Sequence, residues 1–151
     1  MHDGKPLTAS DVKCTWEMLT GKSDDKLRVN PRKSWYNNLG EVTTNGDYEV
    51  VFHLKRRQPS FIWLIASGWS PVYPCHVCPN DMRRHPIGTG PFKFVEFKPI
   101  EVIRVTRNPD YWKKDRPYLG AMEHIIIPSV STLMLGFIAG KFDVIALHRG
   151  F

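Results

Sequence analysis

The sequence is poor in cysteine and has no long apolar run. Only 3 of its 151 residues are cysteines, an odd number that cannot pair completely within one chain, which excludes a disulfide framework. No apolar run approaches the ~20 residues of a membrane-spanning helix. The first residues, MHDGKPLTAS, lack the apolar centre of a secretory signal. We therefore expect no membrane span, and either a cytoplasmic location or a signal outside this sequence.

Recognisable catalytic motifs are also missing. The 6 histidines form no HExxH or HxxxH pair, and no Ser–His–Asp series has the context of a nucleophile elbow. Gly88-Thr89-Gly90 lacks the spacing of a phosphate loop and precedes a predicted strand, so we interpret it as a tight structural turn. An enzyme needs a constellation of reactive groups. The sequence therefore predicts a protein that is not an enzyme and uses no cofactor or metal.

The stretch YPCHVCPN at residues 73–80 has two cysteines three positions apart. Cys75 and Cys78, with His76 or His85, would give zinc only a cramped ligand set, and Cys14 is far away in sequence. A redox pair would need a helix N-terminus to activate its thiolate. We favour a structural or accidental thiol pair over a metal or redox site. In an oxidising compartment, we expect these two cysteines to close a small disulfide.

The net charge of +6 and the pI of about 9.3 arise mainly in the middle of the chain. Residues 51–100 hold 7 basic and 2 acidic residues, with basic clusters at Lys55-Arg56-Arg57 and Arg83-Arg84. A nucleic-acid-binding protein should show a longer basic stripe or a recognition motif. We therefore prefer a solvated basic face. A small basic module that binds nucleic acid or an acidic protein partner remains the alternative.

The whole chain has 42% hydrophobic and 24% charged residues, a composition typical of a globular protein. In its first half, periodicity predicts several helices and strands. PLTASDVKCTWEMLTGK predicts a helix that Thr8 or Ser10 caps and Gly21 ends. Its apolar residues Val12, Trp16 and Leu19 share one face. Alternating residues after Asn45-Gly46-Asp47 predict a strand, and QPSFIWLIAS predicts a short buried helix. GWSPVYPCHVCPND predicts a loop.

The second half is predicted to contain a sheet and one strong helix. IGTGPFKFVEFKPIEVIRVTRN predicts two antiparallel strands, and MEHIIIPS a third. SVSTLMLGFIAGK predicts a helix, which Ser129 caps and Gly140 ends. FDVIAL predicts a further buried strand. Because tight strand–helix–strand connections are almost always right-handed and parallel, we expect a C-terminal βαβ unit in a mixed α/β fold.

Three side chains are candidates for ligand binding. The guanidinium of Arg32 can grip a carboxylate, and the indole of Trp35, three residues later, can stack on a ligand. Trp69 lies in a Gly-Trp-Ser-Pro loop, where it would suit the rim of a cleft. The alternative is that the tryptophans serve packing and that Arg32 forms a surface ion pair.

Five segments together resemble one protein family. They are HDGKPLTASDVKCTWE, GDYEVVFHL, HPIGTGPFKF, RNPDYWKKDRPYL and FIAGKFDV. In this order and at this spacing they resemble the family 5 extracytoplasmic solute-binding proteins of peptide, nickel and opine ABC importers. The resemblance implies a two-lobed periplasmic binding protein-like fold that closes on a peptide or metal-chelate ligand without catalysis. It also implies an ABC permease as partner and a periplasmic or extracytoplasmic location.

The resemblance also predicts a division of the chain. Residues 1–84 would be most of the extra domain on the N-terminal lobe, and residues 85–151 part of that lobe's sheet. Arg32-Lys33-Ser34-Trp35 resembles an Arg-x-x-Trp element that lines the cleft in nickel-type members, and Trp69 falls in a loop that can face the same cleft. Family members are several times longer, so we expect a truncated chain with weak or lost ligand affinity. Its uncovered strand edges predict a homodimer.

Overall fold

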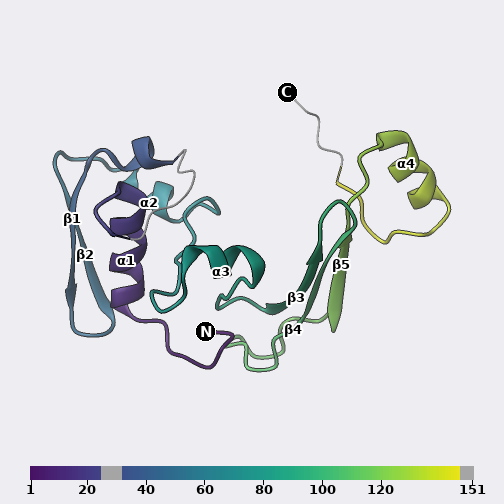
Figure 1. Ribbon diagram of the computed structural model, residues 1–151, viewed down its shortest axis with the longest axis horizontal. Helices are drawn as coiled ribbons and strands as arrows, with labels where there is room; N and C mark the ends of the chain where they lie inside the picture. The colour runs from purple at the N-terminus through teal and green to yellow at the C-terminus, as the bar shows by residue number, and fades with distance from the viewer. Residues whose placement is uncertain (25–31, 147–151) are drawn as a thin grey trace.

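The computed structural model describes residues 1–24 and 32–146, which form two bodies joined by loops and a short helix (Figure 1). The first body contains helix α1 (Ala9–Thr20), the 3-10 helix η1 (Lys33–Tyr36), strands β1 (Leu39–Asn45) and β2 (Glu49–Leu54), and helix α2 (Phe61–Ile65). A short helix, α3 (Pro79–Arg84), follows. The second body contains strands β3 (Phe92–Lys98), β4 (Val102–Arg107) and β5 (Ala121–Ile125), and then helix α4 (Val130–Ile138).

Helix α1 begins and ends where the sequence predicted. The backbone N–H and hydroxyl of Thr8 both donate to the carboxylate of Asp11, at 2.9 and 3.2 Å, which fixes the first turn. Gly21 ends the helix in the left-handed conformation, with φ of 78°, which glycine adopts without steric cost. The predicted apolar face is confirmed, because Trp16 and Leu19 are buried and Val12 packs against them.

The core of the first body lies between α1, the β1–β2 hairpin and α2. β1 and β2 are antiparallel, and Phe52 places its ring between Trp16 and Phe61, with ring centroids 5.1 and 5.6 Å away. Tyr36 and Leu39 complete this cluster from η1 and the start of β1. The sequence missed β1, since residues 39–45 lack a clean alternation. Their burial follows from α1, which covers one face of the hairpin.

Two predictions around α2 need correction. The predicted short helix is present, but only Phe61 is buried, whereas Ile62 and Trp63 are 66% and 78% exposed. A helix this short faces the core with one side only, so its successive apolar side chains cannot all be buried. The region predicted as a loop at residues 68–81 contains the start of α3, which Pro79 begins at its first position.

The second body is a three-stranded antiparallel sheet in the order β3–β4–β5. All three strands were predicted, and so was α4, whose cap is Ser129: its hydroxyl oxygen accepts from the N–H of Thr132 at 3.3 Å. Among the described residues, no helix combines the length and apolar character needed to cross a membrane.

The predicted βαβ unit is wrong over the described part of the chain. Residues 142–146 form no strand, and residue 147, the last of the predicted strand, lies outside the described residues. After α4 the chain folds back on its own helix: a Cβ at Gly136 would lie 2.4 Å from the ring of Phe142. A strand needs a neighbour's backbone groups to pair with, and residues 142–146 pair with no strand of this sheet.

Candidate functional site

The predicted ligand-binding residues lie on η1 and on the loop after α2. Arg32 immediately precedes η1, and its guanidinium donates a hydrogen bond to the backbone carbonyl of Trp69. The hydroxyls of Tyr36 and Ser70 are hydrogen-bonded at 2.6 Å in the buried layer below, and Ser70 also donates to the carbonyl of Leu64 at 2.9 Å. The structure therefore joins η1 to the loop at residues 67–70.

The two candidate tryptophans are exposed near this junction. Trp35 is 44% exposed and Trp69 is 68% exposed, so neither indole is committed to the core. Trp35 lines an open hollow of about 610 Å³, to which Trp69 does not contribute. The structure thus brings Arg32 to the backbone of Trp69 and leaves the Trp35 and Trp69 indoles available for stacking. Trp63 on α2, at 78% exposed, is a further free aromatic side chain that the sequence did not single out.

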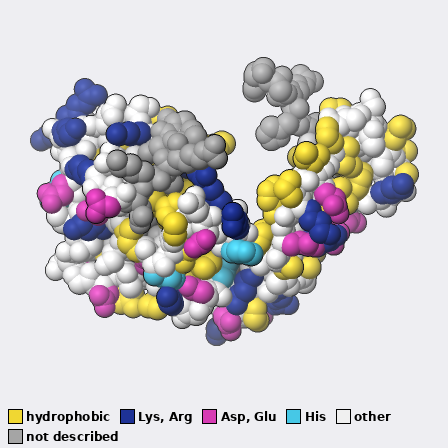
Figure 2. Space-filling model, in the orientation of Figure 1, with side chains coloured by type: hydrophobic (Ala, Val, Ile, Leu, Met, Phe, Trp, Pro, Cys, Tyr) yellow, Lys and Arg dark blue, Asp and Glu magenta, His cyan; other side chains and the backbone are white. Residues whose placement is uncertain are grey.

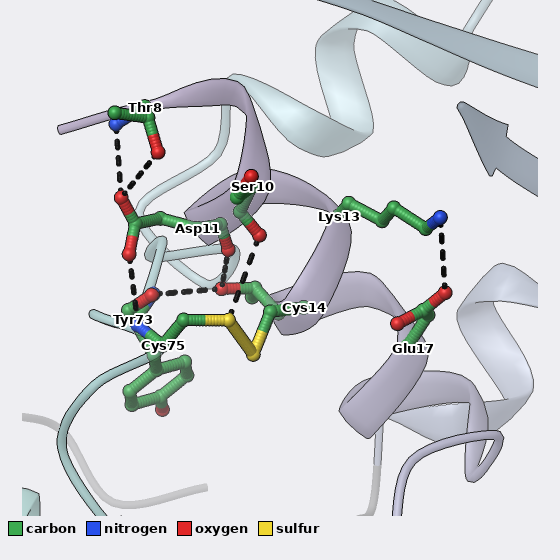
Figure 3. Close-up of a disulfide and its surroundings, with 9 residues drawn as sticks. Thr8, Ser10, Asp11, Lys13, Cys14, Glu17, Tyr73 and Cys75 are labelled. Carbon is green, nitrogen blue, oxygen red and sulfur yellow. Dashed lines mark hydrogen bonds and ion pairs between the residues drawn. A yellow bond between two sulfur atoms is a disulfide. The ribbon is translucent and has the colours of Figure 1, made fainter. Parts of the chain in front are cut away.

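The cysteine prediction is wrong. Cys75 forms a disulfide with Cys14 of α1, 61 residues away, and leaves Cys78 as an exposed free thiol (Figure 3). One disulfide therefore forms, although the odd number of cysteines argued against a disulfide framework. The fold causes this pairing: the buried carboxylate of Asp11 accepts from the N–H of Cys75 at 2.8 Å. The hydroxyl of Thr15 accepts from the N–H of Tyr73 at 2.8 Å. These bonds lay residues 73–75 along α1.

This pairing removes both chemical readings of the CxxC stretch. Cys75 has no thiolate to offer a metal or a redox partner, and His76 is paired with Asp3 at 2.6 Å. Burial raises the pKa of Asp3, but hydrogen bonds from His76 and from the N–H of Lys5, with the charge of His76, lower it overall. Within residues 1–24 and 32–146, no group of three or more His, Cys, Asp or Glu side chains is placed to hold a metal ion.

Three of the family-like segments meet at one carbonyl group. The oxygen of Gly90 lies 2.9 Å from Nε2 of His2 and accepts from the side-chain amide of Asn108 at 3.2 Å. The N–H of Gly88 donates to Nδ1 of His2 at 3.3 Å, which assigns the hydrogen of the imidazole to Nε2. The HDG, GTG and RNPDYW stretches are therefore structural here, and the interpretation of Gly88-Thr89-Gly90 as a turn agrees with these contacts.

Comparison with known proteins gives the same relative by sequence and by structure. The chain is 37% identical to the oligopeptide-binding protein AppA of Bacillus subtilis over an alignment of 152 positions, which covers 94% of this chain and 27% of that protein. The structure of that protein in complex with a nonapeptide matches with a TM-score of 0.76 over 93% of this chain and 29% of that one, at 35% identity. The chain thus spans under a third of the length of these relatives.

Two further solved structures show the same fold. HbpA2 of Haemophilus parasuis matches with a TM-score of 0.82 at 26% identity, over 96% of this chain and 31% of that one. NikZ of Campylobacter jejuni in complex with Ni(L-His) matches with a TM-score of 0.80 at 23% identity, over 94% and 28%. The sequence pattern of the bacterial extracellular solute-binding proteins, family 5, described as their middle part, matches residues 2–149. The chain therefore belongs to this family of bacterial extracellular solute-binding proteins.

Proposed function

We propose that the chain is part of the solute-binding component of a peptide-type ABC importer, which captures a ligand without catalysis and delivers it to a membrane permease. The observation that carries this proposal is the 37% identity to an oligopeptide-binding protein over 94% of the chain. The exposed indoles of Trp35 and Trp69, tied through Arg32, would form one wall of the ligand site. A metal chelate is the alternative ligand that the resemblance leaves open.

A binding protein normally buries most of its ligand's surface, and this chain spans under a third of the length of its relatives. We therefore expect the chain alone to bind peptides with a dissociation constant weaker than micromolar. The test is a nuclear magnetic resonance titration of isotope-labelled protein with a mixture of peptides at millimolar concentration. We expect the indole N–H signals of Trp35 and Trp69 to move. The signal of Trp112, which is 73% exposed beyond β4, should stay in place.

Replacement of Trp69 by Phe should abolish one of the moving signals, and replacement of Trp112 by Phe serves as the matched control. Absence of any shift at saturating peptide would contradict peptide capture at this wall. Micromolar binding by calorimetry would contradict the expectation of weak affinity and leave the peptide proposal standing. Movement with a nickel–histidine chelate alone would assign the metal-chelate ligand instead.

An extracytoplasmic location is the second part of this proposal. The Cys14–Cys75 disulfide supports it, because structural disulfides persist in oxidising compartments. Mass mapping of alkylated protein should find Cys14 and Cys75 joined after export and Cys78 alkylated. Full alkylation of all three cysteines in exported protein would contradict it.

We further propose that the chain on its own forms a homodimer through β5 and α4. Hydrophobic side chains spread over this part of the molecule (Figure 2). Those that are at least 37% exposed are Ile125, Ile126, Val130, Met134, Leu135, Phe137 and Ile138. Together they form an uncovered apolar patch, and patches of this kind mark protein–protein contact surfaces. The outer edge of β5 pairs with no described strand, so a second copy can extend the sheet there.

A further inference from the structure

A basic cluster singled out by its sequence lies beside Trp35 in the fold. The β1–β2 hairpin pairs Leu39 with Leu54, which places residues 55–57 alongside residues 37–38. The side-chain amide of Asn38 donates to the carbonyl of Arg56 at 3.0 Å, and its oxygen accepts from the N–H of Arg56 at 3.1 Å. The N–H of Lys55 donates to the carbonyl of Asn38 at 2.9 Å. The backbone of Arg56 is therefore fixed at both its N–H and its carbonyl group.

These residues surround the hollow of about 610 Å³ described above. It is lined by Ser34, Trp35, Asn37, Asn38, Arg56, Arg57, Gln58 and Pro59. In the space-filling view, Lys and Arg side chains gather at this upper end of the hairpin (Figure 2). None of the residues that line the hollow is acidic, so the two guanidinium groups meet no carboxylate in its wall.

The polar groups of this wall are mostly hydrogen-bond donors. The oxygen of the Gln58 side chain already accepts from the amide of Asn38 at 2.7 Å, which leaves its NH₂ group as a donor. The hydroxyl of Ser34, the amide of Asn37 and the indole N–H of Trp35 add further donors. A wall of donors with two positive charges is complementary to an oxyanion. The half-exposed indole of Trp35 offers a flat apolar face beside it.

We propose that this hollow binds a small organic oxyanion that carries a flat apolar group, of which an aromatic carboxylate is the simplest form. Arg56 and Arg57 hold the oxyanion, and Trp35 stacks on the flat group. The same chemistry is offered by a free aromatic acid and by the C-terminus of a peptide that ends in an aromatic residue. The site shares Trp35 with the proposed peptide-binding wall, but a free aromatic acid tests it without any peptide.

The experiment is a magnetic resonance titration of the whole chain with benzoate, followed by the indole signal of Trp35 and the side-chain N–H signals of arginine. We expect saturable shifts with benzoate and none with benzyl alcohol, which has the ring without the charge. A tripeptide that ends in phenylalanine is compared with its C-terminal amide. Binding of the acid-terminated peptide but not of the amide, at an affinity above that of benzoate, identifies the peptide terminus as the source.

The chain supplies matched controls for each part of the site. The double change Arg56→Gln and Arg57→Gln should weaken benzoate at least tenfold. Arg83→Gln with Arg84→Gln removes the same charge from an exposed pair on α3 and should change affinity less than twofold. Trp35→Leu should weaken benzoate binding severalfold, whereas Trp63→Leu, at a more exposed aromatic position on α2, should not.

Equal weakening by both arginine pairs would show that net charge alone attracts the anion, and would overturn the proposal. Equal response to benzoate and benzyl alcohol, or no saturable shift, would also overturn it. All six side chains to be replaced are exposed, so the variants should fold, and unchanged backbone spectra verify this.

Discussion

At the scale of single residues, the polar side chains that matter most join distant segments. Asn108 is only 6% exposed. Its amide donates to Gly90, its side-chain oxygen accepts from the N–H of Asp110 at 3.2 Å, and its backbone N–H donates to the carbonyl of Pro91 at 2.8 Å. With His2 on the same carbonyl, this residue closes the start of the second body onto the N-terminal segment. A buried polar group of this kind is costly to leave without partners.

The replacement Asn108→Ala is therefore expected to lower the free energy of unfolding by about 2 kcal/mol, because it removes two side-chain hydrogen bonds in a buried position. Urea denaturation followed by circular dichroism measures the change. Asn37→Ala, at an exposed position of the first body, is the matched control and should change the free energy by less than about 0.5 kcal/mol. A loss no larger than that of the control would refute the structural role of Asn108.

A pH dependence is expected from the ion pairs of Arg104 with Glu96 and Glu123 on the β3–β4–β5 sheet. The guanidinium of Arg104 donates to Glu96, and this hydrogen bond lowers the pKa of Glu96 from its usual 4.5. Glu96 and Glu123 in turn raise the pKa of Arg104. A carboxyl whose pKa is lowered by folding stabilises the native state above its unfolded pKa, and this contribution is lost as the pH falls through the folded value.

The variant Glu96→Gln should accordingly be less stable than the parent above about pH 5, and the difference should vanish as the pH falls below the pKa of Glu96. Urea titrations at a series of pH values measure it. Glu41→Gln, an exposed carboxylate on β1, is the control. A difference between parent and Glu96→Gln that stays constant down to acid pH would exclude the Glu96–Arg104 pair as its cause.

At the scale of elements, helix α1 contacts both the core of the first body and the segment at residues 73–75. Its apolar face fills the core, and its other side carries the disulfide and the hydrogen bonds of Asp11 and Thr15 to residues 73–75 (Figure 3). Helix α4 is the contrast. It forms as predicted, with a cap and a full apolar pattern, but none of its residues is buried.

Loss of the Cys14–Cys75 disulfide should cost about 2–4 kcal/mol of stability, because the bridge closes a long loop that is otherwise free in the unfolded chain. The double variant Cys14→Ser and Cys75→Ser is compared with Cys78→Ser, which removes only the free thiol. We expect a lower urea midpoint for the first and an unchanged midpoint for the second. Equal loss of stability in the double variant and in Cys78→Ser would instead favour a Cys75–Cys78 pairing, because both variants remove a cysteine of that pair.

At the scale of the whole molecule, the two bodies differ in how completely they bury their apolar residues. The buried cluster lies in the first body, whereas the second body presents most of the hydrophobic side chains of β5 and α4 to its surface (Figure 2). Relatives that this chain matches over 27–31% of their length carry much more chain. An apolar surface of this size needs a cover.

The dimer proposed above predicts the effect of a charge on this surface. Leu135→Glu with Ile138→Glu, at 67% and 76% exposed, should convert a dimer to a monomer in light scattering, because both carboxylates would be desolvated at the interface. Ile62→Glu, at 66% exposed on α2, is the matched control and should leave the dimer intact. A parent chain that is monomeric at high concentration would exclude this dimer.

Local patterns in the sequence determined the elements whose signals are complete within a few residues. The stop at Gly21 and the apolar face of α1 were predicted, and the cap at Thr8 was one of two candidates. Strands β2 to β5 and helix α4 were also predicted, because each depends on backbone preference and periodicity. The tertiary structure alone decided which distant residues meet. Burial along α1 brings Cys75 to Cys14 rather than to Cys78. Hairpin register places Arg56 and Arg57 beside Trp35. The chain after α4 packs on Gly136 rather than forming a strand, since pairing requires a partner edge that no local pattern can specify.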